Sequence, residues 1–150
     1  MIKELNYVDI VENRESIEEL LKICFRSTYG RDVKQVVIDE KYNSLAVHVK
    51  AENAYVFGCF DEEKLIGFMW GYPVITPFET VFHIAYIALF EYGRRKGIGS
   101  KLLYEAEKQA VELGIDRIEL IVGATNDKAE EFYKKAGYQT CRNVMAKSIK

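Results

Sequence analysis

The chain has 150 residues, of which 49% are hydrophobic and 29% charged, and its formal net charge is −2. This size and composition are typical of one globular domain spanning residues 1–150. No apolar run approaches the roughly 20 residues that cross a bilayer, and so small a net charge gives no general support for nucleic-acid binding. The N-terminus carries acids where a secretion signal carries basic and then apolar residues, so we expect a cytoplasmic protein with no membrane or nucleic-acid partner.

A strand and two helices are predicted over the first 50 residues. Lys3–Val8 has the composition of a strand, and a helix follows with Asn13 or Ser16 as its N-cap. Apolar residues from Ile17 to Cys24 fall at offsets 0, 3, 4 and 7, the spacing of one helical stripe. Residues 42–49 repeat that spacing and predict a second helix.

Three strands are predicted next. Ala54–Phe60 and Leu65–Tyr72 are rich in β-branched and aromatic residues and are separated by four polar residues, which indicates an antiparallel hairpin. A loop follows, bracketed by the two prolines at positions 73 and 77. Val81–Leu89 is then a nearly continuous apolar run, which favours a strand covered on both faces.

The last third of the chain alternates helices and strands. We expect a helix over Gly97–Leu113, a strand over Arg117–Val122, a helix over Asn126–Ala136 and a final strand or bent pair over Tyr138–Ile149. The full order is β-α-α-β-β-β-α-β-α-β. That order predicts an α/β (α+β) fold, a mixed sheet with helices on both sides.

The three cysteines are widely spaced and odd in number, at Cys24, Cys59 and Cys141. This pattern favours reduced thiols over a disulfide framework or a zinc site. Each lies in an apolar context, so all three are expected in the core. No metal is expected.

The segment between the buried strand and the following helix has the features of a phosphate site. Residues 94–101 contain four cations and no acid, and the helix opens on two glycines, Gly97 and Gly99. Free backbone N–H groups and the positive end of the helix dipole favour a bound phosphate. The spacing is not that of a P-loop, and Leu102 stands where a dinucleotide fingerprint has its third glycine. A helix that merely opens on glycine is the alternative.

The pattern Arg94-x-x-Gly97-x-Gly99 resembles the acetyl-CoA motif of the GNAT superfamily of N-acetyltransferases, Gln/Arg-x-x-Gly-x-Gly/Ala. The segment from Asn126 to Tyr138 resembles the second signature of that family, with Tyr138 in place of the usual phenylalanine. The loop before Arg94 lacks the proline found in many members. The clear resemblance covers residues 81–138. It implies a GNAT-like domain that moves an acetyl group from acetyl-CoA to a primary amine.

The resemblance also implies where the cofactor lies. In this family the pantetheine arm of coenzyme A enters between two parallel strands that splay apart, here Val81–Leu89 and Arg117–Val122. Ile87 and Leu89 would offer backbone contacts to it, and donors near Leu89 would polarise the thioester carbonyl. The pyrophosphate would lie on the loop formed by Arg94, Arg95, Lys96, Gly97, Ile98, Gly99 and Ser100.

Asn126 and Tyr133 are two helical turns apart and therefore project from one face. The resemblance gives Asn126 a cofactor contact and makes Tyr133 the general acid that protonates the departing thiolate. Both residues also have plain structural interpretations. Asn126 has the position of a helix cap, and Tyr133 lies on the apolar stripe of its helix.

The acceptor amine must be neutral to attack, so a base or a water chain is required. The candidates are His83, Glu79 and Tyr86, of which His83 has the most suitable pKa for this role. A lone histidine in an apolar strand is also a common core residue. Because neither motif contains a cysteine, we expect direct transfer in a ternary complex rather than an acyl-enzyme.

Two other functions fit the same residues: a non-catalytic acyl-CoA-binding or sensing module, and a nucleotide-binding domain that uses the basic loop. The identity of the acceptor stays open, and either a small-molecule amine or a protein amine fits. The family would place its pocket at residues 16–50 and 73–80. A homodimer is compatible with the family.

Overall fold

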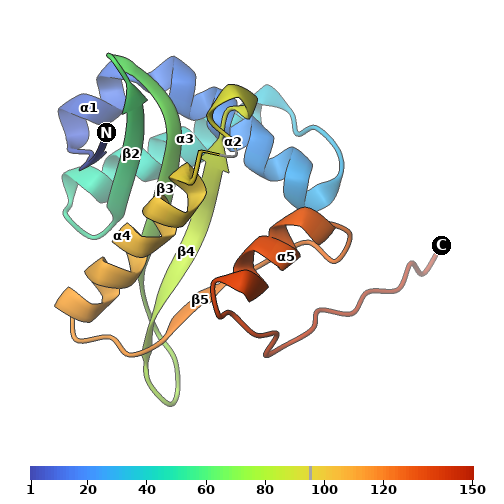
Figure 1. Ribbon diagram of the computed structural model, residues 1–150. Coiled ribbons are helices and arrows are strands. Elements are labelled where there is room, and N and C mark those ends of the chain that lie inside the picture. The colour runs from blue at the N-terminus through green and yellow to red at the C-terminus, as the bar shows by residue number, and fades with distance from the viewer. Residues whose placement is uncertain (95) are drawn as a thin grey trace.

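The computed structural model describes residues 1–94 and 96–150. Within them the chain forms one sheet flanked by helices, as Figure 1 shows. The strands are β1 (Ile2–Glu4), β2 (Tyr55–Asp61), β3 (Lys64–Ile75), β4 (Thr80–Leu89) and β5 (Ile118–Leu120). The helices are α1 (Tyr7–Glu12), α2 (Arg14–Tyr29), α3 (Gln35–Lys50), the short 3-10 turn η1 (Glu91–Gly93), α4 (Ile98–Glu112) and α5 (Asp127–Lys135).

The sheet has the order β1-β2-β3-β4-β5. The first three pairings are antiparallel, and β5 alone runs parallel to its neighbour, β4. The predicted mixed α/β sheet is therefore confirmed, including the β2–β3 hairpin. β3 extends further than predicted, because Pro73 pairs with Phe82 within the β3–β4 ladder.

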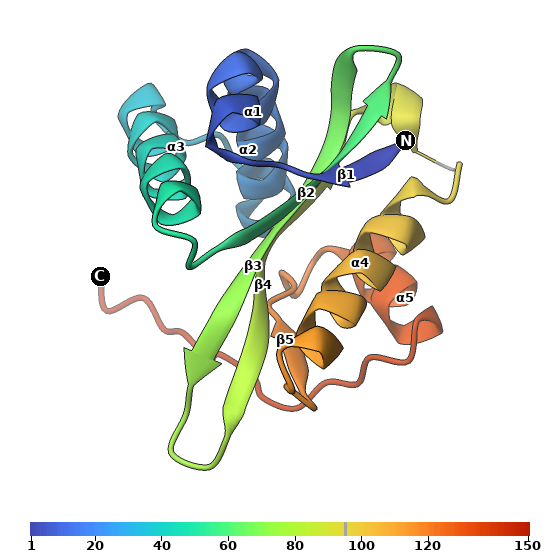
Figure 2. The same ribbon diagram turned by 90° about the vertical axis from the view of Figure 1, so that its left-hand side faces the viewer.

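Two layers of helices cover the sheet. In Figure 2 the sheet is seen nearly edge-on, with α1, α2 and α3 on one side and α4 and α5 on the other. Each side has its own core. The first is built on fully buried α2 residues such as Leu20 and Leu21, and the second on Leu102 and Ala106 of α4. β4 lies between the two cores, as its apolar sequence predicted.

The N-terminus differs from the prediction. The first strand ends at Glu4, and the residues that follow form α1. Asn6 caps this helix: its side chain accepts from the Asp9 backbone, and the Asp9 carboxylate accepts from the Asn6 backbone. This capping box gives the short helix a fixed start that apolar spacing could not reveal. Asn13, one of the two predicted caps, is the N-cap residue of α2.

The predicted final strand over Tyr138–Ile149 is wrong. The structure has no strand among residues 138–150, which run as an irregular tail. Val144, Met145 and Ile149 in this tail are each more than 90% exposed. Large apolar residues do not alternate with polar ones along the segment, so it has no continuous face to bury against the sheet. Cys141 lies in the same tail and is exposed, so its predicted core position is also wrong, whereas Cys24 and Cys59 are buried.

No helix among the described residues is both long enough and apolar enough to cross a membrane.

Candidate active site

The parallel strands β4 and β5 share only a short ladder. They pair over three positions, from Phe82 with Ile118 to Ile84 with Leu120. β4 continues to Leu89, five residues further, after β5 has ended. The β3–β4 register also shifts between Trp70 and Gly71, so Ala85 lies at an irregularity in the ladder. The second half of β4 therefore presents an edge that no described strand covers.

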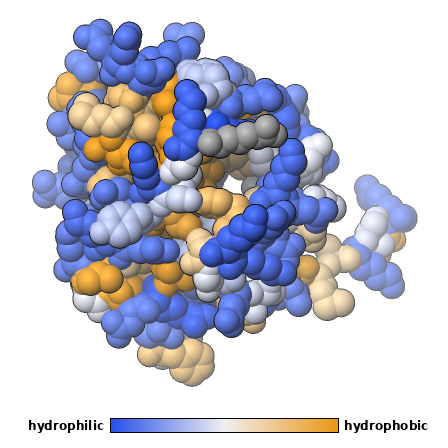
Figure 3. Space-filling view, in the orientation of Figure 1, coloured by the Kyte–Doolittle hydropathy of each residue, from blue (hydrophilic) through white to orange (hydrophobic). Residues whose placement is uncertain are grey.

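A cavity of about 1350 Å³ occupies this position. Its walls come from α2, α3, β3, β4, the connection after β5, and α5. Figure 3 shows a hollow beside the hydrophilic outer face of α5. The connection after β5 passes close to α2, because a side chain at Gly123 would overlap the backbone of Thr28. Neither sequence motif includes Gly123, although a glycine directly after a predicted strand, here residues 117–122, is a usable signal of close backbone approach.

One end of the cavity meets the start of α4. Gly97 is the N-cap of this helix, with a left-handed backbone (φ 73°) that favours glycine, and no described side chain caps the first turn. The backbone N–H groups there are available to an anion. Gly99 packs against Phe132 of α5, whose ring would be 3.3 Å from an added Cβ. A Cβ at position 99 would require the Phe132 ring to shift by a few tenths of an ångström.

The residues predicted to bind cofactor fall into three groups. Those that line the cavity are Ile87, Leu89, Arg94, Gly99, Asn126 and Tyr133. Lys96 and Ser100 are exposed beside it, and the Ile98 side chain is buried in the core, leaving only its backbone to face a ligand. Arg95 lies outside the described residues.

Asn126 is the N-cap of α5. Its side-chain oxygen accepts from the Ala129 backbone N–H at 3.3 Å. The structural interpretation of this residue is therefore correct, yet Asn126 also lines the cavity. Because the cap uses the oxygen, the side-chain NH₂ is the group left to donate to a ligand.

Tyr133 is half-buried on α5 and lines the cavity. Its ring contacts those of Phe132 and Tyr138 edge-on, at centroid distances of 5.1 and 5.8 Å. Burial raises the pKa of the Tyr133 phenol well above its usual value, and Cys24 adds to that shift. The hydroxyl is therefore protonated throughout the neutral and mildly alkaline range.

Of the predicted bases, His83 and Tyr86 line the cavity, whereas Glu79 is exposed in the β3–β4 turn and does not. Burial lowers the pKa of His83, which the nearby Glu119 carboxylate partly offsets. Burial raises the pKa of Tyr86 to about 12. His83 is therefore neutral at physiological pH and able to accept a proton, and Tyr86 is not a competent base there.

Several aromatic residues that line the cavity lie outside both sequence motifs, among them Phe25, Trp70 and Tyr72. In the sequence they are indistinguishable from core residues. The usable signal is the i, i+2 spacing of Trp70 and Tyr72, which places both on one face of β3.

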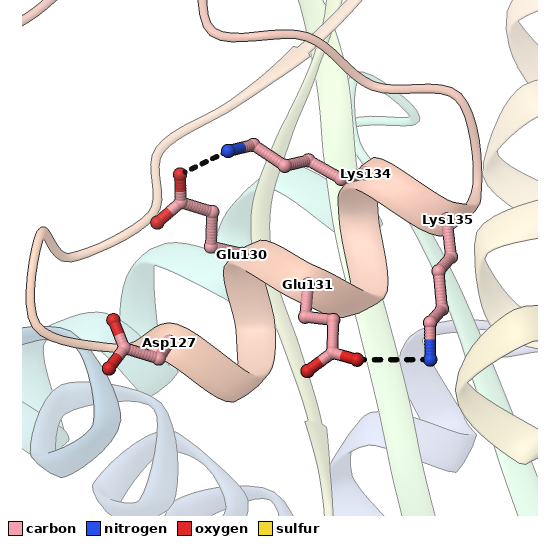
Figure 4. Close-up of a pocket in the computed structure, with 5 residues that line it drawn as sticks. All are labelled: Asp127, Glu130, Glu131, Lys134 and Lys135. Atoms are coloured by element: carbon pink, nitrogen blue, oxygen red, sulfur yellow. Dashed lines mark ion pairs between the residues drawn. The ribbon is translucent and has the colours of Figure 1, made fainter.

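A second depression, of about 460 Å³, lies on the solvent side of α5. Figure 4 shows its five side chains. Glu130 pairs with Lys134 at 2.8 Å, and Glu131 with Lys135 at 3.0 Å. Such i, i+4 pairs are ordinary features of an exposed helix face, so this depression is not the functional site. Among the described residues, no group of three or more His, Cys, Asp or Glu side chains is arranged to hold a metal ion.

Known proteins resemble this chain in sequence and in fold. The model of the Acetyltransferase (GNAT) family matches residues 14–138. The chain is 41% identical over 75 residues to L-ornithine N5-acetyltransferase NATA1 of Arabidopsis thaliana, a stretch covering 49% of this chain. It spans only 33% of the length of that plant enzyme.

Two solved structures share the fold. A tetramutant of the BH1408 protein from Bacillus halodurans superimposes with a TM-score of 0.81 at 20% identity, covering 99% of both chains. Aminoglycoside N-acetyltransferase AAC(6')-Iy, in complex with CoA, superimposes with a TM-score of 0.75 at 12% identity, covering 99% of this chain and 93% of that one. At these sequence identities the two comparisons show a shared fold.

Proposed function

The chain belongs to the Acetyltransferase (GNAT) family, and from this premise we propose that it is an N-acetyltransferase whose large cavity binds acetyl-CoA. The observation that carries the proposal is the continuity of the cavity, which joins the uncapped start of α4 to Tyr133 and the open edge of β4. An elongated ligand with a diphosphate at one end and a thioester at the other matches this shape. The CoA bound by AAC(6')-Iy, which shares the fold, supports the same choice.

The cofactor would be held mainly by backbone and by charge. The N–H groups at the start of α4 and the Arg94 side chain would bind the pyrophosphate, with Arg95 and Lys96 close by in the sequence. Backbone groups of Ile87 and Leu89 would bind the pantetheine arm along the open edge of β4. The Asn126 NH₂ group would donate to the same arm.

The reaction we propose is direct transfer. The neutral amine forms a bond from its nitrogen to the acetyl carbonyl carbon, and the carbon–sulfur bond of the thioester breaks. The amine loses one proton to a base, for which His83 is the proposed residue, and Tyr133 gives one proton to the departing thiolate. The products are an N-acetyl amine and coenzyme A.

A covalent acetyl-enzyme does not fit the cysteines. Cys24 lines the cavity, but burial raises the pKa of its thiol to about 12, and the thiol points to the Ile87 carbonyl oxygen at 3.5 Å. A thiol with that pKa has almost no thiolate at neutral pH and is a poor nucleophile.

We expect only one of the three thiols to label in the native protein. Cys141 is exposed, whereas Cys24 and Cys59 are buried. Brief treatment with iodoacetamide followed by peptide mass spectrometry should find the modification on Cys141. Rapid modification of Cys24, or an acetyl group retained on it after acetyl-CoA is removed, would contradict direct transfer.

We expect Arg94→Gln to weaken acetyl-CoA binding about fivefold, because a charge-assisted contact to a phosphate at a partly exposed site is worth about 1 kcal/mol. Isothermal calorimetry at two salt concentrations checks this, and the loss should shrink at high salt. Lys108→Gln removes an equal charge from the exposed side of α4 and serves as the control. Equal affinities for the two variants would rule out a phosphate contact by Arg94.

Release of thiol from acetyl-CoA over a panel of amines tests the proposed activity, with mass spectrometry to identify the acetylated product. Binding of acetyl-CoA without release of thiol would favour a non-catalytic sensing module. We further propose that residues 1–150 act as one domain and that the protein works in the cytoplasm. A homodimer stays a prediction.

A further inference from the structure

The end of the cavity away from α4 is walled by aromatic rings. They come from three elements: Phe25 and Tyr29 of α2, Trp70 and Tyr72 of β3, and Tyr86 of β4. Trp70 stacks on its cross-strand partner Tyr86 at 5.1 Å, with 23° between the ring planes. The Tyr72 ring lies beyond Trp70, with 6.2 Å between the two ring centroids. The Phe25 ring lies beyond Tyr86, with 5.8 Å between their centroids. Such a surface favours a flat or apolar group on the bound molecule.

This wall also contains a hydrogen-bond donor without a partner. The indole N–H of Trp70 is buried and has no acceptor among the described residues, while Trp70 itself lines the cavity. An unpaired buried donor costs free energy, because it has lost its hydrogen bond to water and gained none in return. Because that nitrogen is fully buried, it does not face the cavity, and Trp70 contributes to the wall through its ring.

The charge at this end is positive. Lys41 of α3 lines it, and no described acidic side chain forms an ion pair with Lys41. Among the described lining residues the one carboxylate is Glu91, which follows β4 at the opposite end. A ligand with several positive charges would meet a cation and aromatic rings, without the carboxylates that would balance its charge. A ligand with a carboxylate would meet the ammonium group of Lys41.

We propose that the acceptor is a small amine with an aromatic or apolar body and a carboxylate, the chemistry of an aromatic α-amino acid. The inference rests on the proposed acetyl transfer and names its substrate class. The ring packs on Trp70, Tyr72 and Tyr86. The carboxylate pairs with Lys41, which leaves the amine to approach the thioester at the edge of β4.

Trp70 is the one tryptophan of the sequence, so its fluorescence reports directly on this site. The experiment titrates L-phenylalanine, phenethylamine, L-alanine and spermidine into the full chain saturated with coenzyme A. L-Phenylalanine should bind about tenfold more tightly than phenethylamine, which lacks only the carboxylate. L-Alanine, which lacks the ring, should bind more weakly than L-phenylalanine, and spermidine weakest.

Lys41→Gln should reduce the advantage of L-phenylalanine over phenethylamine to less than about twofold, because the ion pair is lost. Lys108→Gln should leave the affinity advantage of L-phenylalanine over phenethylamine unchanged. Tighter binding of spermidine, or an advantage unchanged in Lys41→Gln, would overturn the inference.

Thiol release from acetyl-CoA with the same four amines separates the two proposals. Turnover with L-phenylalanine but not with spermidine supports both acetyl transfer and the proposed acceptor class. Turnover with spermidine alone overturns the acceptor class and leaves acetyl transfer standing. No turnover with any of the four, in a protein that still binds acetyl-CoA, counts against the acetyl transfer on which the inference rests.

Discussion

Replacing Tyr133 with phenylalanine is expected to lower kcat about 10²- to 10⁴-fold, the usual contribution of a positioned general acid. The substitution keeps the ring and its edge contacts with Phe132 and Tyr138 and removes only the hydroxyl. Affinity for acetyl-CoA should therefore change little. Initial rates of thiol release, with calorimetry for the binding constant, measure both quantities.

Tyr138→Phe is the matched control. Tyr138 belongs to the same aromatic cluster, but its hydroxyl donates to Glu107 of α4 at 3.1 Å and does not line the cavity. Loss of the Tyr138 hydroxyl should leave kcat within about twofold of the wild-type value, since no atom at the reaction centre is removed. An equal fall in kcat for both variants would assign the effect to packing rather than to proton transfer.

The pH profile gives a second check on Tyr133. Because burial raises its pKa, the phenol stays protonated at neutral and mildly alkaline pH. Loss of the Tyr133 proton should therefore cause no decline in wild-type kcat between pH 7 and about 9. On the acidic side, kcat should fall only as pH drops through the lowered pKa of His83, below its ordinary value near 6.5, because the protonated imidazole no longer accepts a proton.

Phe82→Ala should lower the free energy of unfolding by about 3–5 kcal/mol, the usual cost of emptying a fully buried phenylalanine site. Phe82 is 0% exposed, contacts the ring of Tyr55 and leaves no room for a side chain at Gly71. Its backbone N–H also donates to the Arg117 carbonyl oxygen at 2.8 Å, so Phe82 lies where β5 joins β4. Urea denaturation measures the change.

Phe78→Ala removes the same side chain from the tip of the β3–β4 turn, where Phe78 is 93% exposed. Its free energy of unfolding should stay within about 0.5 kcal/mol of the wild type. Similar losses for the two variants would contradict the assignment of Phe82 to the core at the β4–β5 junction.

The elements that carry the fold could be predicted because their patterns are long and local. The apolar run of β4, the stripe of α4 and the glycines at 97 and 99 each identify their element without help from distant residues. The α1 helix could not be predicted from apolar spacing, because a six-residue helix depends on its capping box. The scattered apolar residues of the tail after α5 resemble strand composition and so predict a strand, but no strand among the described residues pairs with them.

The proposed cofactor end of the site can be predicted from the sequence for the same reason, since its glycines and basic residues form one continuous segment. The proposed acceptor end cannot. Phe25, Lys41 and Trp70 come from three different elements, and each alone has an ordinary structural role. Only the packing of α2 and α3 on the face of β3 and β4 brings them to one cavity.

Thermal denaturation with acetyl-CoA, coenzyme A, ATP and NAD at matched concentrations tests the central claim most directly. A ligand that binds only the folded chain raises its stability by about 2.7 kcal/mol at a hundred times the dissociation constant. We expect a rise in Tm with acetyl-CoA and coenzyme A and none with NAD. A comparable rise with ATP, or no rise with either coenzyme A species, would contradict the assignment of this cavity to acetyl-CoA.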